Sequence, residues 1–171
     1  MLICETPRLR VRYLDPFVDA PFILKLLNEP SFLENIGDRG VRTLDDAKRY
    51  ITDGPLASYA RHGFGLFCVE LKEATPGEAA VPIGMCGLLK RDWLPDVDIG
   101  FAFLPQFWSK GYAIESAQAV VDWGRAQRGV TRVVGITSHH NHGSMRVLEK
   151  LGLRRAGVVR SPEGQESQLF T

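Results

Sequence analysis

A long helical segment between two strand-like segments limits the folds open to this chain more than any other feature. Residues 97–104 and 132–137 have the character of strands, and residues 111–127 carry apolar and small residues at helical spacing. A helix that connects two neighbouring strands of one sheet places those strands in parallel. The sequence therefore predicts one parallel pair of strands.

The segments before this crossover predict a different kind of pairing. Residues 64–71 and 83–90 also read as strands, and turn-rich residues follow each of them, at 73–82 and 91–96. Short connections of this kind indicate an antiparallel meander. A mixed α/β sheet follows, and its antiparallel start argues against a doubly wound nucleotide-binding fold.

The rest of the chain supplies further strands and the helices that cover the sheet. Strands are expected at 8–13, 156–160 and 167–170, and helices at 20–27, 43–60 and 144–151. Residues 33–42 read as a loop, and Gly54-Pro55 as an interruption of the second helix. We therefore expect one domain, residues 1–171, built on a mostly antiparallel sheet of six to seven strands with helices on both faces.

Composition and charge exclude several classes of protein. The 171 residues suit one domain with a sizeable core, and a formal net charge of +1 lacks the basic excess typical of nucleic-acid binders. No apolar run is long enough to cross a membrane. The N-terminus lacks the order of a signal peptide, so a cytoplasmic location is expected. The cysteines Cys4, Cys68 and Cys86 are scattered, so neither a disulfide framework nor a zinc site is predicted.

A short basic loop directly before the long helix has the features of a phosphate-binding site. Its sequence is WSKGYA, residues 108–113. Lys110 adds positive charge, and Gly111 lets the backbone approach a phosphate. Helix N-termini also present unpaired N–H donors and a partial positive charge. The same features fit an ordinary helix start, and neither a P-loop nor a G-x-G-x-x-G motif is present.

A second polar segment follows the strand at 132–137. Asn141 offers both a donor and an acceptor, and Ser144 stands at the start of the next helix. By itself, this pattern also fits an asparagine turn with a serine N-cap. It therefore indicates a site only in combination with the loop at 108–113.

Together these motifs resemble the GNAT superfamily of acetyl-CoA-dependent N-acetyltransferases, in particular the group typified by bacterial ribosomal-protein N-terminal acetyltransferases (Rim type). The matching segments are ETPRL at 5–9, DIGF at 98–101, WSKGYAIE at 108–115, and NHGS at 141–144 with RVLEKLG at 146–152. The resemblance spans essentially the whole chain. It implies a GNAT-like fold in which the two parallel strands splay apart.

The resemblance also implies how the chain would hold acetyl-CoA as its cosubstrate. Backbone N–H groups of residues 109–113 would bind the pyrophosphate. Pantetheine would lie between the splayed strands, where backbone groups around Phe103 and Leu104 would pair with it and polarise the acetyl carbonyl. Asn141 would bind the pantetheine arm, and Ser144 would lie near the thioester sulfur. The implied CoA-binding residues are Phe103, Leu104, Trp108, Ser109, Lys110, Gly111, Tyr112, Ala113, Asn141 and Ser144.

The sequence departs from the family pattern at two positions. Ser109 replaces the glycine of many relatives, which is tolerable where its φ is negative. Leu148 replaces a tyrosine that protonates the leaving thiolate in much of the superfamily, so Ser144 or an ordered water would serve as the acid. Asp98 is the first candidate for a base that deprotonates the amine, although a strand carboxylate also fits a structural role.

Three histidines and several carboxylates complete the candidates. His139, His140 and His142 cluster near Asn141, where they could contact substrate or shuttle protons, and no metal site is predicted. The acceptor pocket is expected among the first two helices, the loop at 33–42 and the last strands. Acidic residues there would suit a cationic amine; they are Asp15, Asp19, Glu29, Glu34 and Asp38.

The predicted function is therefore transfer of an acetyl group from acetyl-CoA to a primary amine by direct attack in a ternary complex. The acceptor would be a protein N-terminal α-amine or a small-molecule amine. A non-catalytic CoA-binding sensor or scaffold domain is the alternative. Neither a nucleic-acid partner nor a membrane is expected, and the chain would be a monomer or a homodimer.

Overall fold

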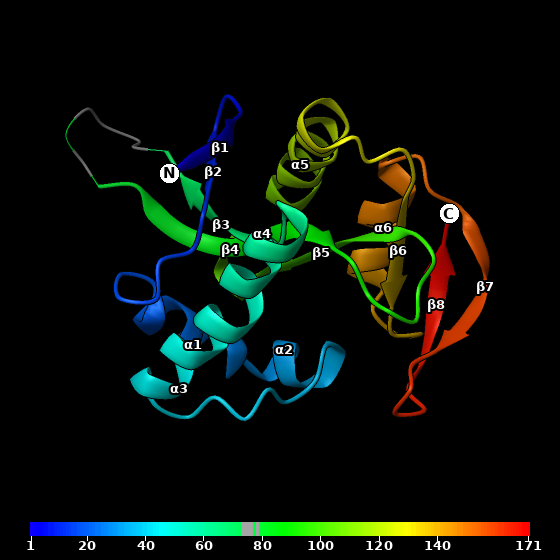
Figure 1. Ribbon diagram of the computed structural model, residues 1–171, viewed down its shortest axis with the longest axis horizontal. Coiled ribbons are helices and arrows are strands. Elements are labelled where there is room, and N and C mark those ends of the chain that lie inside the picture. The colour runs from blue at the N-terminus through cyan, green and yellow to red at the C-terminus, as the bar shows by residue number, and fades with distance from the viewer. Residues whose placement is uncertain (73–76, 78) are drawn as a thin grey trace.

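The structure, a computed structural model, describes residues 1–72, 77 and 79–171. Within these residues, eight strands form one sheet in the order β1-β2-β3-β4-β5-β6-β8-β7 (Figure 1). The strands are β1 (Leu2–Glu5), β2 (Leu9–Arg12), β3 (Leu66–Leu71), β4 (Val81–Leu89), β5 (Val97–Phe103), β6 (Val133–Thr137), β7 (Arg155–Arg160) and β8 (Glu166–Phe170). About half of the turn expected at 73–82 lies outside the described residues.

The sheet is antiparallel except at one pair of strands. Strands β1 to β5 form an antiparallel meander, and β6, β8 and β7 pair antiparallel at the other end. Strands β5 and β6 pair in parallel, which confirms the mixed α/β sheet predicted from the sequence. Strand β1 brings the described sheet to eight strands rather than six or seven. Its four residues at a sheet edge are too short a segment to show a clear alternation of polar and apolar residues.

The two parallel strands separate soon after they meet. Their paired residues are Val97 with Val133 and Asp98 with Val134, although β5 continues to Phe103 and β6 to Thr137. All residues of both strands are described, so the later residues of each strand have no partner strand on the facing edge. The splay implied by the family resemblance is therefore present.

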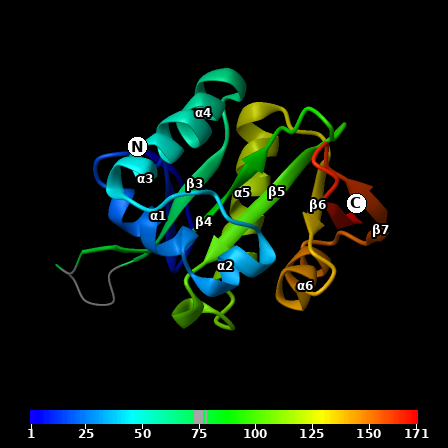
Figure 2. The same ribbon diagram turned by 90° about the horizontal axis from the view of Figure 1, so that it is seen from below.

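Helices cover both faces of the sheet, as expected. They are α1 (Ala20–Leu27), α2 (Pro30–Asn35), α3 (Leu44–Ile51), α4 (Ala57–His62), α5 (Tyr112–Arg128) and α6 (His142–Lys150). Helices α5 and α6 pack on one hydrophobic core, and α1, α2 and α3 pack on a second core across the sheet. Figure 2 shows α1, α2 and α3 on the near side of the sheet and α5 behind it. In the described part of the chain, no helix has the length and apolar character needed to span a membrane.

One local detail differs from the sequence-based expectations, and a second gives an expected interruption its form. The sequence predicts a loop at 33–42, but its first residues belong to α2, because Pro30 suits the first turn of a helix and Phe32 is buried. The sequence also predicts an interruption at Gly54-Pro55. The α-helix is interrupted there: Thr52–Leu56 forms a π-helical turn between α3 and α4, which accommodates the missing N–H of the proline.

Candidate active site

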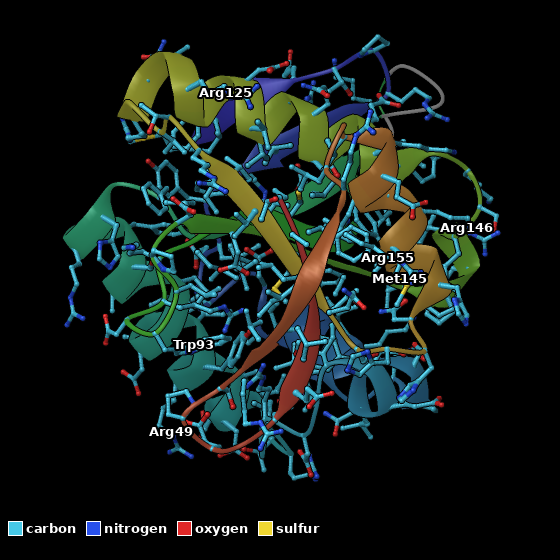
Figure 3. All side chains as sticks on the ribbon, turned by 90° about the vertical axis from the view of Figure 1, so that its right-hand side faces the viewer. Arg49, Trp93, Arg125, Met145, Arg146 and Arg155 are labelled. Carbon is cyan, nitrogen blue, oxygen red and sulfur yellow. The ribbon has the colours of Figure 1, made fainter. Side chains whose placement is uncertain are left out.

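A cavity of about 380 Å³ lies where β5 and β6 separate. Its walls come from α2 and α3, from β5, β6 and α6, and from the turn between β7 and β8. Figure 3 looks onto β7 and β8 and shows this turn on the side where Trp93, another lining residue, lies. Asp98 and Ser144, the two predicted catalytic residues, both line the cavity. The structure therefore brings the predicted catalytic pair into one space.

The N-terminus of α5 is open to an anion. Its N-cap residue is Gly111, with a φ of 82°, and no described side chain caps the helix. By contrast, Thr43 and Asp46 form a capping box at α3. The first N–H groups of a helix have no acceptor within it. The uncapped first turn of α5, which begins with Tyr112 and Ala113, therefore leaves donors and a partial positive charge for a ligand.

Ser109 has a left-handed backbone conformation, so the negative φ that would make a serine tolerable at this position is not present. Its φ is 59°, and it is the only non-glycine residue of the described chain with a positive φ. This conformation costs an L-residue about 1–2 kcal/mol, whereas glycine adopts it freely. The loop before α5 therefore keeps its shape at an energetic cost, a feature that clusters at ligand-binding and active sites.

A cluster of hydrogen bonds ties the N-terminal segment to this loop. Glu115, in the first turn of α5, accepts hydrogen bonds from the Thr6 hydroxyl at 2.5 Å and from Arg8 Nε at 2.7 Å. Arg8 Nη1 donates to the Lys110 carbonyl at 2.9 Å. Burial raises the pKa of Glu115, but the hydrogen bonds from Thr6 and Arg8 outweigh burial and hold that pKa below its usual value. We call Thr6, Arg8, Lys110 and Glu115 the N-terminal clamp.

Trp108 and Lys110 contribute to the loop in different ways. The Trp108 indole N–H donates to the Phe103 carbonyl at 2.8 Å, which anchors the loop to the end of β5. The Lys110 ammonium lies 5.8 Å from the centre of the Phe107 ring. Because Lys110 is exposed, its charge is accessible to an anionic ligand.

The edge of β5 that faces the gap carries backbone groups of Phe101 and Phe103. In an antiparallel pair, alternate residues direct their N–H and C=O groups to the same neighbour. The Leu104 N–H donates to the Ile83 carbonyl at 3.0 Å, so this N–H points towards β4. In the unbroken register of β4 and β5, Phe103 and Phe101 then point towards the gap. The structure therefore favours Phe101 and Phe103, rather than Leu104, as donors to an acetyl carbonyl.

Asn141 and Ser144 are held together at the start of α6. Asn141 Oδ1 accepts a hydrogen bond from the Ser144 N–H at 3.1 Å, so Asn141 caps the helix. This bond leaves the NH₂ group of the amide for a ligand. Ser144 and Leu148 both line the cavity. On this face of α6, the Ser144 hydroxyl can donate a proton, whereas Leu148 cannot.

Asp98 is a buried carboxylate with an arginine partner. Its side chain is 2% exposed, and Arg91 Nε donates to Asp98 Oδ1 at 3.0 Å. Burial raises the pKa of Asp98, and Arg91 opposes this shift. A carboxylate with a raised pKa is the stronger proton acceptor. Sequence reasoning missed Arg91, because a turn residue carries no local signal of its partner.

The three predicted histidines do not line the described cavity. His139 Nε2 lies 3.1 Å from Glu166 Oε1 on β8 instead. Within the ranges that the structure describes, no group of three or more His, Cys, Asp or Glu side chains is placed to hold a metal ion.

The acidic acceptor pocket expected from the sequence does not form. Asp19 is buried and pairs with Arg12 at 2.8 Å, and Asp38 pairs with Arg42 at 2.5 Å. These carboxylates serve as structural partners, and none of the five expected acidic residues is among the described residues that line the cavity. The charged lining residues are Arg39, Arg91, Asp98 and Glu163.

Comparisons with known proteins give a consistent family. The sequence profile described as "Acetyltransferase (GNAT) domain" matches residues 8–154. YjdG of Bacillus subtilis (strain 168), which bears the name of an uncharacterized N-acetyltransferase, is 39% identical over 155 residues, with 89% of each chain covered.

Solved structures share the fold. RimL, a ribosomal L7/L12 alpha-N-protein acetyltransferase in complex with coenzyme A, has a TM-score of 0.82 at 14% identity, covering 99% of this chain and 96% of RimL. AAC(6')-Ib in complex with paromomycin and acetyl-CoA has a TM-score of 0.71 at 21% identity, covering 95% and 91%. At these identities the likeness shows the fold alone. The matching profile and the likeness to YjdG show that this chain belongs to the GNAT acetyltransferase family.

Proposed function

We propose that residues 1–171 form one N-acetyltransferase domain that moves the acetyl group of acetyl-CoA to a primary amine by direct attack in a ternary complex. The observation that carries the proposal is the separation of β5 from β6 just beyond Asp98 and Val134. The cavity at this separation contains both a buried carboxylate, Asp98, and a hydroxyl group, Ser144. Family membership and the CoA ligands of RimL and AAC(6')-Ib support acetyl-CoA as the donor.

Acetyl-CoA would bind along the open edge of β5. The pyrophosphate takes hydrogen bonds from backbone N–H groups of residues 109–113, and Lys110 adds its charge. The pantetheine arm lies between the splayed strands and pairs with the gap-facing backbone groups of Phe101 and Phe103. The NH₂ group of Asn141 reaches the same arm from the start of α6.

The chemistry then needs few side chains. The amine nitrogen attacks the thioester carbon, a C–N bond forms, and the C–S bond breaks as CoA leaves. The N–H group of either Phe101 or Phe103 stabilises the negative charge on the carbonyl oxygen, while the other pairs with the pantetheine arm. Asp98 takes the proton of the amine through water, and Ser144 gives a proton to the thiolate and regains one from water. Most of the rate comes from holding both substrates together.

The charges of the cavity favour an acceptor with few positive charges. Asp98 already has an arginine partner, Glu163 is exposed, and Arg39 adds positive charge. A polyamine or an aminoglycoside presents several ammonium groups, which are bound best by several free carboxylates. A protein N-terminal α-amine or a small monoamine fits better. An α-amine with a pKa of about 8 is also more often neutral, and so more reactive, than a lysine near 10.4.

A direct test measures thiol release from acetyl-CoA with a panel of amines. The panel contains a short peptide with a free N-terminus, a small monoamine, a polyamine and an aminoglycoside. The N-acetylated form of the same peptide, with no lysine, is the matched control. We expect release with the free peptide or the monoamine and none with the blocked peptide. Binding of acetyl-CoA without amine-dependent release across the panel would support the sensor alternative instead.

A further inference from the structure

One buried hydroxyl beside the cavity lacks a hydrogen-bond partner. Among the described residues, Ser138 alone has a buried side-chain nitrogen or oxygen, its Oγ, without such a partner. Ser138 lines the cavity and was not among the residues singled out from the sequence. Buried polar atoms in proteins are nearly always paired, so a buried hydroxyl without a partner needs an explanation.

The backbone around Ser138 is fixed on both sides. Thr137, the last residue of β6, is paired with Gln168 of β8. The Ser138 carbonyl accepts a hydrogen bond from the Asn141 N–H at 3.2 Å, and Asn141 in turn caps α6. The hydroxyl is therefore carried by a rigid corner, which is a good support for a ligand contact.

Ser138 directly follows the strand that pairs in parallel with the strand of Asp98. Strand register pairs Asp98 with Val134, and side chains of paired residues share a face. Because side chains alternate along a strand, Ile136 lies on that face; Ser138 follows the last residue of β6 and lines the same cavity as Ile136. This face is the one that α1, α2 and α3 cover, because Ala102, which shares a face of β5 with Asp98, packs on the core that contains Phe32. The register places Ser138 four residues, about 13 Å along the chain, beyond the residue that pairs with Asp98, so it stands further along the gap than the candidate base.

We propose that Ser138 is an acceptor-binding residue whose hydroxyl oxygen accepts a hydrogen bond from an N–H of the attacking amine. The proposal rests on the proposed acetyltransferase function. A neutral primary amine has two N–H groups and one lone pair, and the lone pair must stay free to attack the thioester. Holding an N–H at Ser138 turns the lone pair towards the gap where the acetyl group lies.

A hydroxyl suits this task better than a second carboxylate. A nearby negative charge favours the ammonium form of an amine, which has no lone pair for attack. A serine oxygen accepts a hydrogen bond and carries no charge, so it binds the amine without stabilising its protonated form. Ser138 then orients the amine, and the proton of the amine reaches Asp98 through water.

The test compares Ser138→Ala and Ser138→Thr with wild type, using the best acceptor of the amine panel. The Ser138→Ala variant removes the hydroxyl, and Ser138→Thr keeps it. We expect Ser138→Ala to raise the acceptor KM about five- to tenfold, the loss typical of one hydrogen bond. Its acetyl-CoA Kd should change less than about twofold, and Ser138→Thr should retain most of the acceptor affinity.

Thermal stability separates this role from a structural one. In the free protein the Ser138 hydroxyl is buried without a hydrogen-bond partner, which is unfavourable. Removing it in Ser138→Ala should therefore leave the melting temperature unchanged or raise it by about 2–4 °C. A lower melting temperature together with lower activity would assign Ser138 to the fold and overturn the proposal. An unchanged acceptor KM, or a matching loss of acetyl-CoA affinity, would also overturn it. Failure of wild type itself to turn over any amine would instead refute the proposed function, and the inference with it.

Discussion

Replacing Arg8 by alanine is expected to weaken acetyl-CoA binding more than it weakens the fold. Arg8 Nε lies 2.7 Å and Nη2 2.6 Å from Glu115 Oε2, and Nη1 lies 2.9 Å from the Lys110 carbonyl. The Arg8 side chain is 46% exposed, so water screens the ion pair and its contribution to unfolding is at most about 1 kcal/mol. The hydrogen bond to Lys110 adds about 1 kcal/mol. The unfolding free energy should therefore fall by about 1–2 kcal/mol.

The effect on binding comes from the loop before α5. Without Arg8, the backbone at Lys110 is held less firmly, and acetyl-CoA must order it on binding. Ordering one residue costs about 1–2 kcal/mol, which corresponds to about a 5- to 30-fold higher Kd. Titration calorimetry with acetyl-CoA measures the Kd, and urea denaturation measures the unfolding free energy.

Arg10, on β2 and two residues after Arg8, supplies a matched control. Arg10 Nε pairs with Glu5 at 3.0 Å, both side chains are 42% exposed, and the pair does not touch the loop. Arg10→Ala should change the Kd less than about twofold, which is within the small effect of an exposed pair. Equal Kd values for Arg8→Ala and Arg10→Ala would refute the reasoning. Glu115→Ala separates indirect from direct action: it should weaken binding as Arg8→Ala does, whereas stronger binding would mean that a freed Arg8 contacts the phosphates itself.

Further predictions concern the clamp, the loop and the base. The pKa of Glu115 is lowered in the folded state, so the clamp stabilises the fold above about pH 4.5 and loses this effect as the pH falls through the folded-state pKa. The difference in unfolding free energy between wild type and Glu115→Gln should therefore become smaller as the pH is lowered. Ser109→Gly should raise the unfolding free energy by about 0.5–1 kcal/mol, whereas an equal gain in Ser109→Ala would contradict the assigned strain. Gly111→Ala puts a Cβ on a residue with a φ of 82°, 3.2 Å from Arg8 Nη2, so both the unfolding free energy and the affinity for acetyl-CoA should fall. An unchanged Kd for acetyl-CoA, measured by titration calorimetry, would count against the role of this turn in binding. Asp98→Asn should lower kcat by about 10²–10⁴-fold. It should also abolish the fall in rate at low pH that protonation of Asp98 causes in wild type. If the rate of the variant falls at low pH as that of wild type does, Asp98 is not the base.

Local patterns in the sequence predicted most of the fold. The strands and helices have clear periodicity, and the helix between residues 97–104 and 132–137 requires a parallel pair. Strand β1 was missed because an exposed edge of four residues shows little alternation. Helix α2 was missed because its six residues depend on the burial of Phe32, a tertiary effect.

The features of the site that depend on neighbouring residues could be predicted from the sequence. The features that depend on contacts between distant residues could not. The open start of α5 follows from Gly111 and the residues beside it. The pairing of Arg8 with Glu115 spans 107 residues, and such a contact leaves no local signal. The choice between Phe103 and Leu104 depends on the register of β4 and β5. Ser138 drew no attention in the sequence because one serine among many gains meaning only from its burial.

Hydrogen exchange with and without acetyl-CoA tests the central claim most directly, because it locates the cosubstrate residue by residue. The account predicts slower exchange at the N–H groups of residues 109–113 and of Phe101 and Phe103, with no change at β2 (Leu9–Arg12). Protection at another surface, or no change anywhere with acetyl-CoA in excess, would contradict the placement of CoA between β5 and β6.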